Sequence, residues 1–117
     1  MSRIENLQRV LDLGIVSIIR AESGEQLVDV AQALYDGGID VIEVTFTVPG
    51  VLDIISDVKK ALGDKIVLGA GTVLDTESAR AAILAGAEFI VTPTVNTDVI
   101  QLCNRYDKMV MPGGMTP

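Results

Sequence analysis

The sequence has no histidine, no tryptophan and a single cysteine, Cys103. Imidazole and thiolate groups are the ligands that zinc and most transition metals prefer, so we expect no metal site. One cysteine cannot form an internal disulfide, which fits a reducing compartment such as the cytoplasm. Aromatic residues make up only 3% of the chain. The hydrophobic core must therefore be built from aliphatic side chains.

A basic surface and long apolar runs are missing as well. The formal net charge is −7, which argues against nucleic acid and anionic membrane as partners, because both bind basic surfaces. No apolar run approaches the ~20 residues that span a bilayer, and residues 1–6 lack an apolar signal region. These absences predict a soluble cytoplasmic domain. A small anionic substrate is compatible with the charge, since a site can be locally positive.

The apolar residues divide the chain into alternating strands and helices. We expect strands at five short apolar runs, with one helix in each interval and one before the first strand; the runs are 15–20, 41–47, 66–70, 89–92 and 109–111. Helix starts are indicated by Ser2 with Glu5, Ser23 with Gln26, Pro49 in a first turn, Asp75 or Thr76, and Asn96. This alternation predicts a parallel sheet in one α/β domain over residues 1–117.

Two architectures fit this pattern. One is an open, doubly wound sheet, which is complete with five strands. The other is a (β/α)₈ TIM barrel, present as an incomplete barrel of about five parallel strands with an N-terminal helix; eight such units need roughly 200 residues. Two features favour the barrel. The chain ends at Pro117, where the next helix should begin, and polar side chains occur in or just beyond the carboxyl-terminal halves of strands: Glu43, Thr45, Thr47, Thr72 and Thr92.

The strand expected at 41–47 carries a carboxylate among apolar residues. Alternation places Ile42 and Val44 on one face and Glu43 on the other. A buried carboxylate is costly unless it is paired, hydrogen-bonded or functional. Glu43 is therefore either the ion-pair partner of Arg20, which ends the first strand, or an acid–base group. The two interpretations are compatible, because such a partner often holds a catalytic acid.

Two further patterns carry less information. Gly69 to Thr72 follows the third strand, and it is either a tight turn or a weak nucleotide signal, since it lacks both the full G-x-G-x-x-G pattern and the P-loop lysine. The four lysines fall late in a helix or just before strands, opposite the carboxyl ends of the strands, so we expect solvated surface charges and no pocket nucleophile; they are Lys59, Lys60, Lys65 and Lys108.

Four segments, in their order and spacing, resemble the 2-keto-3-deoxy-6-phosphogluconate / 4-hydroxy-2-oxoglutarate aldolase family; they are IEVTFTVP at 42–49, GAGTV at 69–73, GAEFIVTP at 86–93 and MPGGMTP at 111–117. The resemblance implies a class I aldolase on a (β/α)₈ barrel, commonly a homotrimer, with no metal or organic cofactor. It also implies an Entner–Doudoroff type reaction. A 2-keto acid substrate is cleaved to pyruvate and an aldehyde, either glyceraldehyde 3-phosphate or glyoxylate.

Position in these motifs implies roles for single residues. Glu43 matches the family's proton-carrying glutamate, and Arg20 an arginine that lies near it. Thr72 matches the threonine that contacts the pyruvate carboxylate, and Pro93 a proline of the pocket wall. Thr47 stands where many members carry an arginine that helps to bind the carboxylate, so we expect a different carboxylate contact there.

The resemblance also implies a missing nucleophile. In the family, a lysine on strand six forms a Schiff base with the ketone of pyruvate, and later glycine-rich loops bind phosphate; both would lie beyond Pro117. We therefore expect the 117-residue chain to be the N-terminal portion of such an aldolase and to be inactive alone. Two alternatives stay open: a non-catalytic half-barrel interaction module with exposed strand edges, and another Schiff-base or phosphate-binding barrel enzyme.

Overall fold

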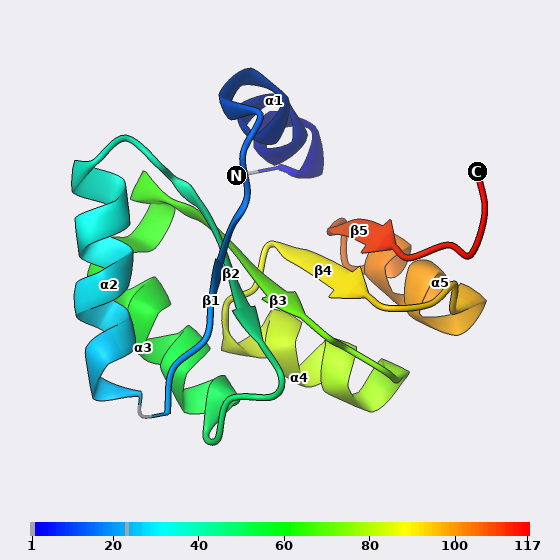
Figure 1. The fold of residues 1–117 in the computed structure, drawn as a ribbon. Helices are drawn as coiled ribbons and strands as arrows, with labels where there is room; N and C mark the ends of the chain where they lie inside the picture. The colour runs from blue at the N-terminus through cyan, green and yellow to red at the C-terminus, as the bar shows by residue number, and fades with distance from the viewer. Residues whose placement is uncertain (1, 23) are drawn as a thin grey trace.

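The computed structural model describes residues 2–22 and 24–117, and in this part of the chain helices alternate with five strands (Figure 1). The elements are α1 (Arg3–Leu13), β1 (Ser17–Ile19), α2 (Glu25–Asp36), β2 (Val41–Thr45), α3 (Val51–Leu62), the short 3₁₀ helix η1 (Gly63–Lys65), β3 (Val67–Gly71), α4 (Thr76–Ala85), β4 (Phe89–Thr92), α5 (Thr97–Arg105) and β5 (Met109–Pro112). The predicted α/β class and element order are confirmed. No helix in the described ranges is long and apolar enough to cross a membrane.

Capping side chains start three of the helices where the sequence predicts them. The Ser2 hydroxyl accepts from the Glu5 amide at 3.2 Å, and the Glu5 carboxylate accepts from the Ser2 amide at 2.9 Å. Asp75 caps α4, and Asn96 caps α5. The predicted cap at Ser23 lies outside the described residues.

Pro49 does not lie in the first turn of a helix, so that prediction is wrong. Gly50 adopts a left-handed conformation at the N-cap, with φ of 70°, and α3 begins only at Val51. A φ in this region is strained for residues other than glycine. The glycine turn therefore delays the helix by two residues and leaves Pro49 before the cap.

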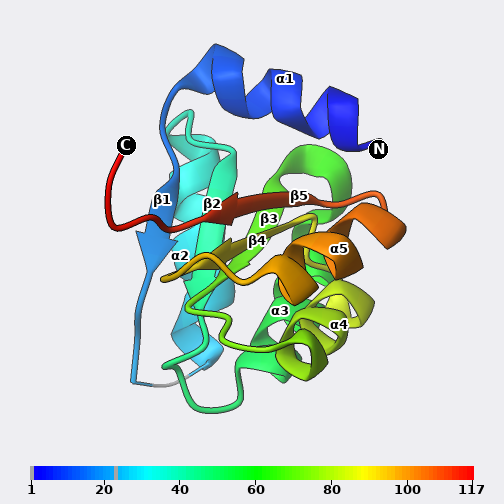
Figure 2. The same ribbon diagram turned by 90° about the vertical axis from the view of Figure 1, so that its right-hand side faces the viewer.

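The order of the strands decides between the two predicted architectures. The sheet runs β1-β2-β3-β4-β5, and every neighbouring pair is parallel. A doubly wound sheet reverses its strand order and carries helices on both faces. Here the order never reverses, and α2 to α5 follow one another along one side of the sheet (Figures 1 and 2). The fold is thus a partial (β/α)₈ barrel, open between β1 and β5.

The two faces of the sheet bury different sets of side chains. Ile42, Val44, Leu68 and Ile90 pack against the helices. Val41, Val67, Phe89 and Met109 form a separate cluster on the inner face, to which Val10 and Leu13 of α1 add. The predicted alternation of β2 is confirmed, since Ile42 and Val44 face the helices and the intervening Glu43 shares the inner face with Val41.

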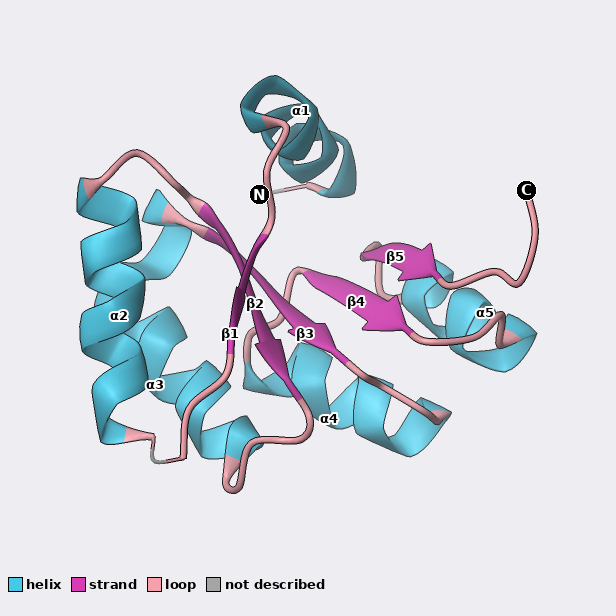
Figure 3. Ribbon diagram, viewed as in Figure 1, coloured by secondary structure: helices cyan, strands magenta, loops and turns pink. Residues whose placement is uncertain are grey.

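Helix α1 lies across the amino ends of the strands, apart from the helices that flank the sheet (Figure 3). Its Arg9 ties it to the segments before β2 and β3, because the guanidinium reaches Asp40 at 2.9 Å and the Lys65 carbonyl at 2.8 Å. The loops that follow the strands lie at the opposite, carboxyl ends.

Candidate active site at the carboxyl ends of the strands

The residues singled out from the sequence gather at one end of the sheet. Arg20 directly follows β1, Thr72 follows β3 and Pro93 follows β4, while Thr47 lies two residues beyond β2. Because these strands are parallel and adjacent, their carboxyl ends meet. Active sites of (β/α)₈ enzymes lie on this side. The structure therefore places four of the candidates just beyond the carboxyl ends of adjacent strands, and the fifth, Glu43, in the middle of β2.

Glu43 lies in the middle of β2, with its side chain on the inner face. Its Cα is in register with Ile18 of β1 and Gly69 of β3, and the residue is only 5% exposed. Burial raises the pKa of the Glu43 carboxyl above its ordinary value, and the positive charge of Arg20 lowers it by less. The result is a carboxyl group that favours its neutral form more than an exposed glutamate does.

The predicted ion pair between Glu43 and Arg20 is present only as a longer-range interaction. Arg20 is exposed, and the ion pairs within 4.0 Å among the described residues do not include these two. The arginine still acts on the pKa of Glu43. A cation at this range can bind an anionic ligand without first breaking a tight pair.

Glycines of β3 make room for side chains from both neighbouring strands. A Cβ added to Gly71 would overlap the carboxylate of Glu43, and one added to Gly69 would overlap the ring of Phe89. A glycine within a strand often marks a place where another group approaches the backbone closely. The Gly69–Thr72 run therefore serves to admit neighbouring side chains.

Thr72 has an unusual backbone conformation, with φ of 57°. Few β-branched residues adopt this left-handed region, and it costs roughly 1–3 kcal/mol. Hydrogen bonds hold the backbone on both sides: the Phe46 amide donates to the Gly71 carbonyl at 2.8 Å, and the Val73 amide to the Val91 carbonyl at 3.2 Å. Such strain gathers at functional sites, where surrounding structure imposes it.

The hydroxyl groups near the site have separate local roles. Thr47 donates to the Thr45 hydroxyl at 3.4 Å, and Thr45 donates to the Ile19 carbonyl at 3.5 Å. Thr92 ends β4, as the sequence predicts, but its side chain is not on the inner face. Alternation in β4 places Thr92 on the helix side with Ile90, and its hydroxyl donates to the Thr94 carbonyl at 2.6 Å.

The end of β4 packs closely against the segment that follows β5. The Gly113 amide donates to the Thr92 carbonyl at 2.8 Å. A Cβ on Gly113 would overlap the Pro93 carbonyl. Gly113 thus allows Pro93 to lie directly beside the MPGGMTP segment.

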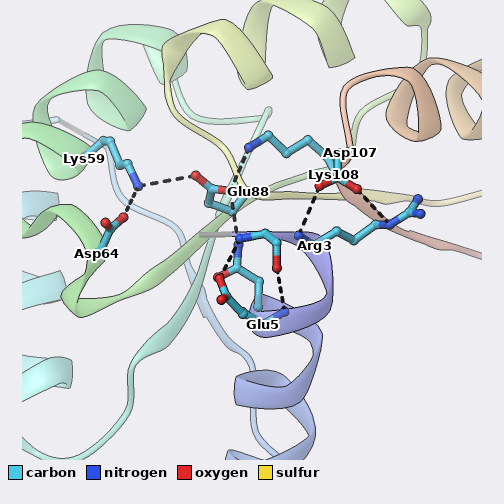
Figure 4. Close-up of polar contacts among 9 residues, drawn as sticks. Arg3, Glu5, Lys59, Asp64, Glu88, Asp107 and Lys108 are labelled. Atoms are coloured by element: carbon cyan, nitrogen blue, oxygen red, sulfur yellow. Dashed lines mark hydrogen bonds and ion pairs between the residues drawn. The ribbon is translucent and has the colours of Figure 1, made fainter.

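The lysines lie where the sequence places them, but two are not simply solvated. Lys59 reaches Glu88 at 3.4 Å and Asp64 at 3.2 Å, and Lys108 reaches Glu88 at 2.8 Å (Figure 4). The expectation of free surface charges is wrong for these two. Glu88 precedes β4 and Lys108 precedes β5, so their positions before neighbouring parallel strands were a usable sequence signal. This charged cluster lies at the end of the sheet opposite Glu43.

Comparison with known proteins decides the family. The sequence model of the aldolase family described as KDPG and KHG aldolase matches residues 5–117. The chain belongs to this family. Among curated relatives, the 2-dehydro-3-deoxy-phosphogluconate aldolase of Treponema pallidum (strain Nichols) is 38% identical over 109 residues, which cover 93% of this chain and 50% of the relative.

Solved structures of this aldolase family share the arrangement. The native KDPGal structure has a TM-score of 0.82 at 33% identity, and the match covers 86% of this chain and 49% of that chain. The KDPG aldolase from Legionella pneumophila, with pyruvate captured as a covalent carbinolamine intermediate, has a TM-score of 0.77 at 26% identity and covers 83% and 47%. The chain thus spans about half the length of the relatives it matches.

Proposed function

We propose that this chain supplies the proton-carrying half of an aldolase site. The reaction is cleavage of 2-keto-3-deoxy-6-phosphogluconate (KDPG) or 4-hydroxy-2-oxoglutarate to pyruvate and an aldehyde through a lysine Schiff base. The observation that carries the proposal is Glu43, a carboxyl that is 5% exposed on the inner face of a partial barrel. Its pKa is raised by burial, as suits a group that both accepts and returns a proton.

The chemistry requires an amine and a carboxylate. The lysine amine adds to the substrate ketone and water leaves, which gives an iminium. Glu43 takes the proton of the C4 hydroxyl while the C3–C4 bond breaks. The electron pair of that bond moves into the iminium to form an enamine, and the aldehyde departs. Glu43 then returns the proton to C3. Water adds to the iminium, and pyruvate and the free lysine are released.

The other site residues bind the substrate in this proposal. Thr72 contacts the carboxylate of the pyruvate portion, which would explain why its strained backbone is held from both sides. Arg20 supplies the positive charge that acts on Glu43 and binds an anionic substrate group. Thr47 adds a hydroxyl at the rim, and Pro93 forms the wall that Gly113 supports.

The nucleophilic lysine comes, in this proposal, from a segment other than these 117 residues. Lys59 and Lys60 lie in the last turns of α3, and Lys65 and Lys108 precede β3 and β5. All four lie toward the amino ends of the strands, opposite Glu43. We infer that the barrel is completed by further β/α units, acts in the cytoplasm and assembles as a homotrimer.

Trapping with borohydride tests this function. The chain alone, incubated with pyruvate and sodium borohydride, should show no lysine adduct by mass spectrometry. Mixed with the half of the Treponema pallidum relative that it does not cover, it should form a barrel that traps one pyruvate per barrel and cleaves KDPG or 4-hydroxy-2-oxoglutarate. An adduct on the chain alone, or an assembled barrel without any adduct, would contradict the proposal.

A further inference from the structure

Glu43 reaches across to the neighbouring strand. Gly71, at the end of β3, is in register with Thr45 rather than with Glu43. Even so, the site that a Cβ would take on Gly71 is filled by the carboxylate of Glu43, and Glu43 Cγ is 3.0 Å from it. The outer half of the Glu43 side chain therefore lies on the bare backbone of β3, two residues beyond Gly69, its own register partner.

The backbone at Gly71 has little freedom to move away. Its carbonyl accepts the Phe46 amide at 2.8 Å, which joins it to the end of β2. The next residue is Thr72, whose strained conformation is also held by hydrogen bonds. A methyl group at position 71 would therefore displace the flexible end of Glu43 rather than the strand.

The charged surroundings of Glu43 are simple. On β3 it lies opposite Gly69 and against Gly71, which carry no charge, and the charge that lowers its pKa is that of Arg20, after β1. The β3 backbone also shields the carboxylate from water, since the residue is 5% exposed. Position 71 thus controls both the location and the solvation of the carboxylate.

We propose that Gly71 is a positioning residue: because it has no side chain, the Glu43 carboxylate can lie against the backbone of β3. The consequence for turnover rests on the proposed function of Glu43 as a proton carrier. The placement of the carboxylate does not, and it is measurable without substrate or lysine.

Carbon-detected NMR titration of the Glu43 carboxyl in the 117-residue chain is the direct test. Gly71→Ala should push the carboxylate toward the open mouth of the barrel and toward Arg20. Its apparent pKa should then fall from the raised wild-type value toward that of an exposed glutamate. Gly114→Ala is the matched control, because a Cβ there meets only the Thr116 carbonyl at 3.5 Å, and it should leave the titration of Glu43 unchanged.

Two outcomes would overturn the proposal. One is a Glu43 titration in Gly71→Ala that matches the wild type. The other concerns folding. If Gly71→Ala does not fold, the double variant Glu43→Ala/Gly71→Ala should regain the fold, and its failure to do so would show that Glu43 is not the group displaced.

In the completed barrel, Gly71→Ala should lower kcat on the order of 10²-fold while borohydride still traps pyruvate. If Gly71 positions Glu43, the variant should trap pyruvate normally while the pH dependence of its kcat shifts. If instead the aldolase proposal is wrong, no pyruvate should be trapped at all.

Discussion

Asn6 of α1 donates a hydrogen bond from Nδ2 to Oε2 of Glu88, just before β4, over 3.1 Å. The same carboxylate accepts from Lys108 at 2.8 Å and from Lys59 at 3.4 Å. Asn6 is 1% exposed, whereas Ile4 of the same helix is 77% exposed. Helix α1 is therefore attached to this half of the barrel through a polar side chain, and part of its apolar surface is left uncovered.

Replacing Glu88 by glutamine should destabilise the fold. The amide keeps an acceptor for Asn6 but leaves Lys59 and Lys108, which are partly buried, without their shared counter-charge. We expect the free energy of unfolding, measured by urea denaturation, to fall by about 2 kcal/mol. Asp29→Asn, an exposed position in α2, removes the same charge and should change stability by less than about 0.5 kcal/mol. Equal effects of the two variants would mean that the cluster contributes nothing.

Thr72→Asn should stabilise the chain and impair its proposed site. Asparagine adopts a left-handed conformation more readily than a β-branched residue. The free energy of unfolding should rise by about 1 kcal/mol, while the hydroxyl proposed to contact the carboxylate is lost. Thr94→Asn, at an exposed position where φ is not positive, serves as the control and should leave stability unchanged. Loss of stability in Thr72→Asn would show that the conformation at position 72 is not strained.

Glu43 should make stability depend on pH with a definite sign. Its pKa is raised in the folded chain above the ordinary value of 4.5, so between these two values the folded state binds more protons than the unfolded state. Stability therefore falls as pH rises from about 4.5 through the folded pKa, and it levels off above it. Glu43→Gln removes this dependence. Urea denaturation over a pH series should show the variant gaining stability relative to the wild type across that window; a constant difference would contradict the raised pKa.

Much of the fold was predictable from local pattern. Alternation in β2 placed Glu43 on the inner face, and Ser2, Asp75 and Asn96 marked helix starts, because capping and strand alternation depend on residues close in sequence. The prediction for Pro49 is wrong for an equally local reason, because the left-handed Gly50 delays the helix.

The details of the site depended on contacts between strands. The strand order distinguishes the barrel from the doubly wound sheet, and no periodicity in the sequence encodes that order. The contact between Glu43 and Gly71 joins residues of neighbouring strands that are not register partners. The strain at Thr72 gave no sequence signal, since threonine seldom takes a positive φ. The prediction of solvated charges fails for Lys59 and Lys108 because their partner Glu88 lies on a third segment of the chain.

Proton exchange at the methyl group of pyruvate tests the central claim about Glu43 most directly. In the completed barrel, the Schiff base makes these protons acidic, and in heavy water Glu43 should exchange them for deuterium, which NMR follows. Glu43→Gln should still form the borohydride-trapped adduct but lose methyl exchange by on the order of 10²–10⁴-fold. Exchange at a near-normal rate in Glu43→Gln would contradict the assignment of Glu43 as the proton carrier.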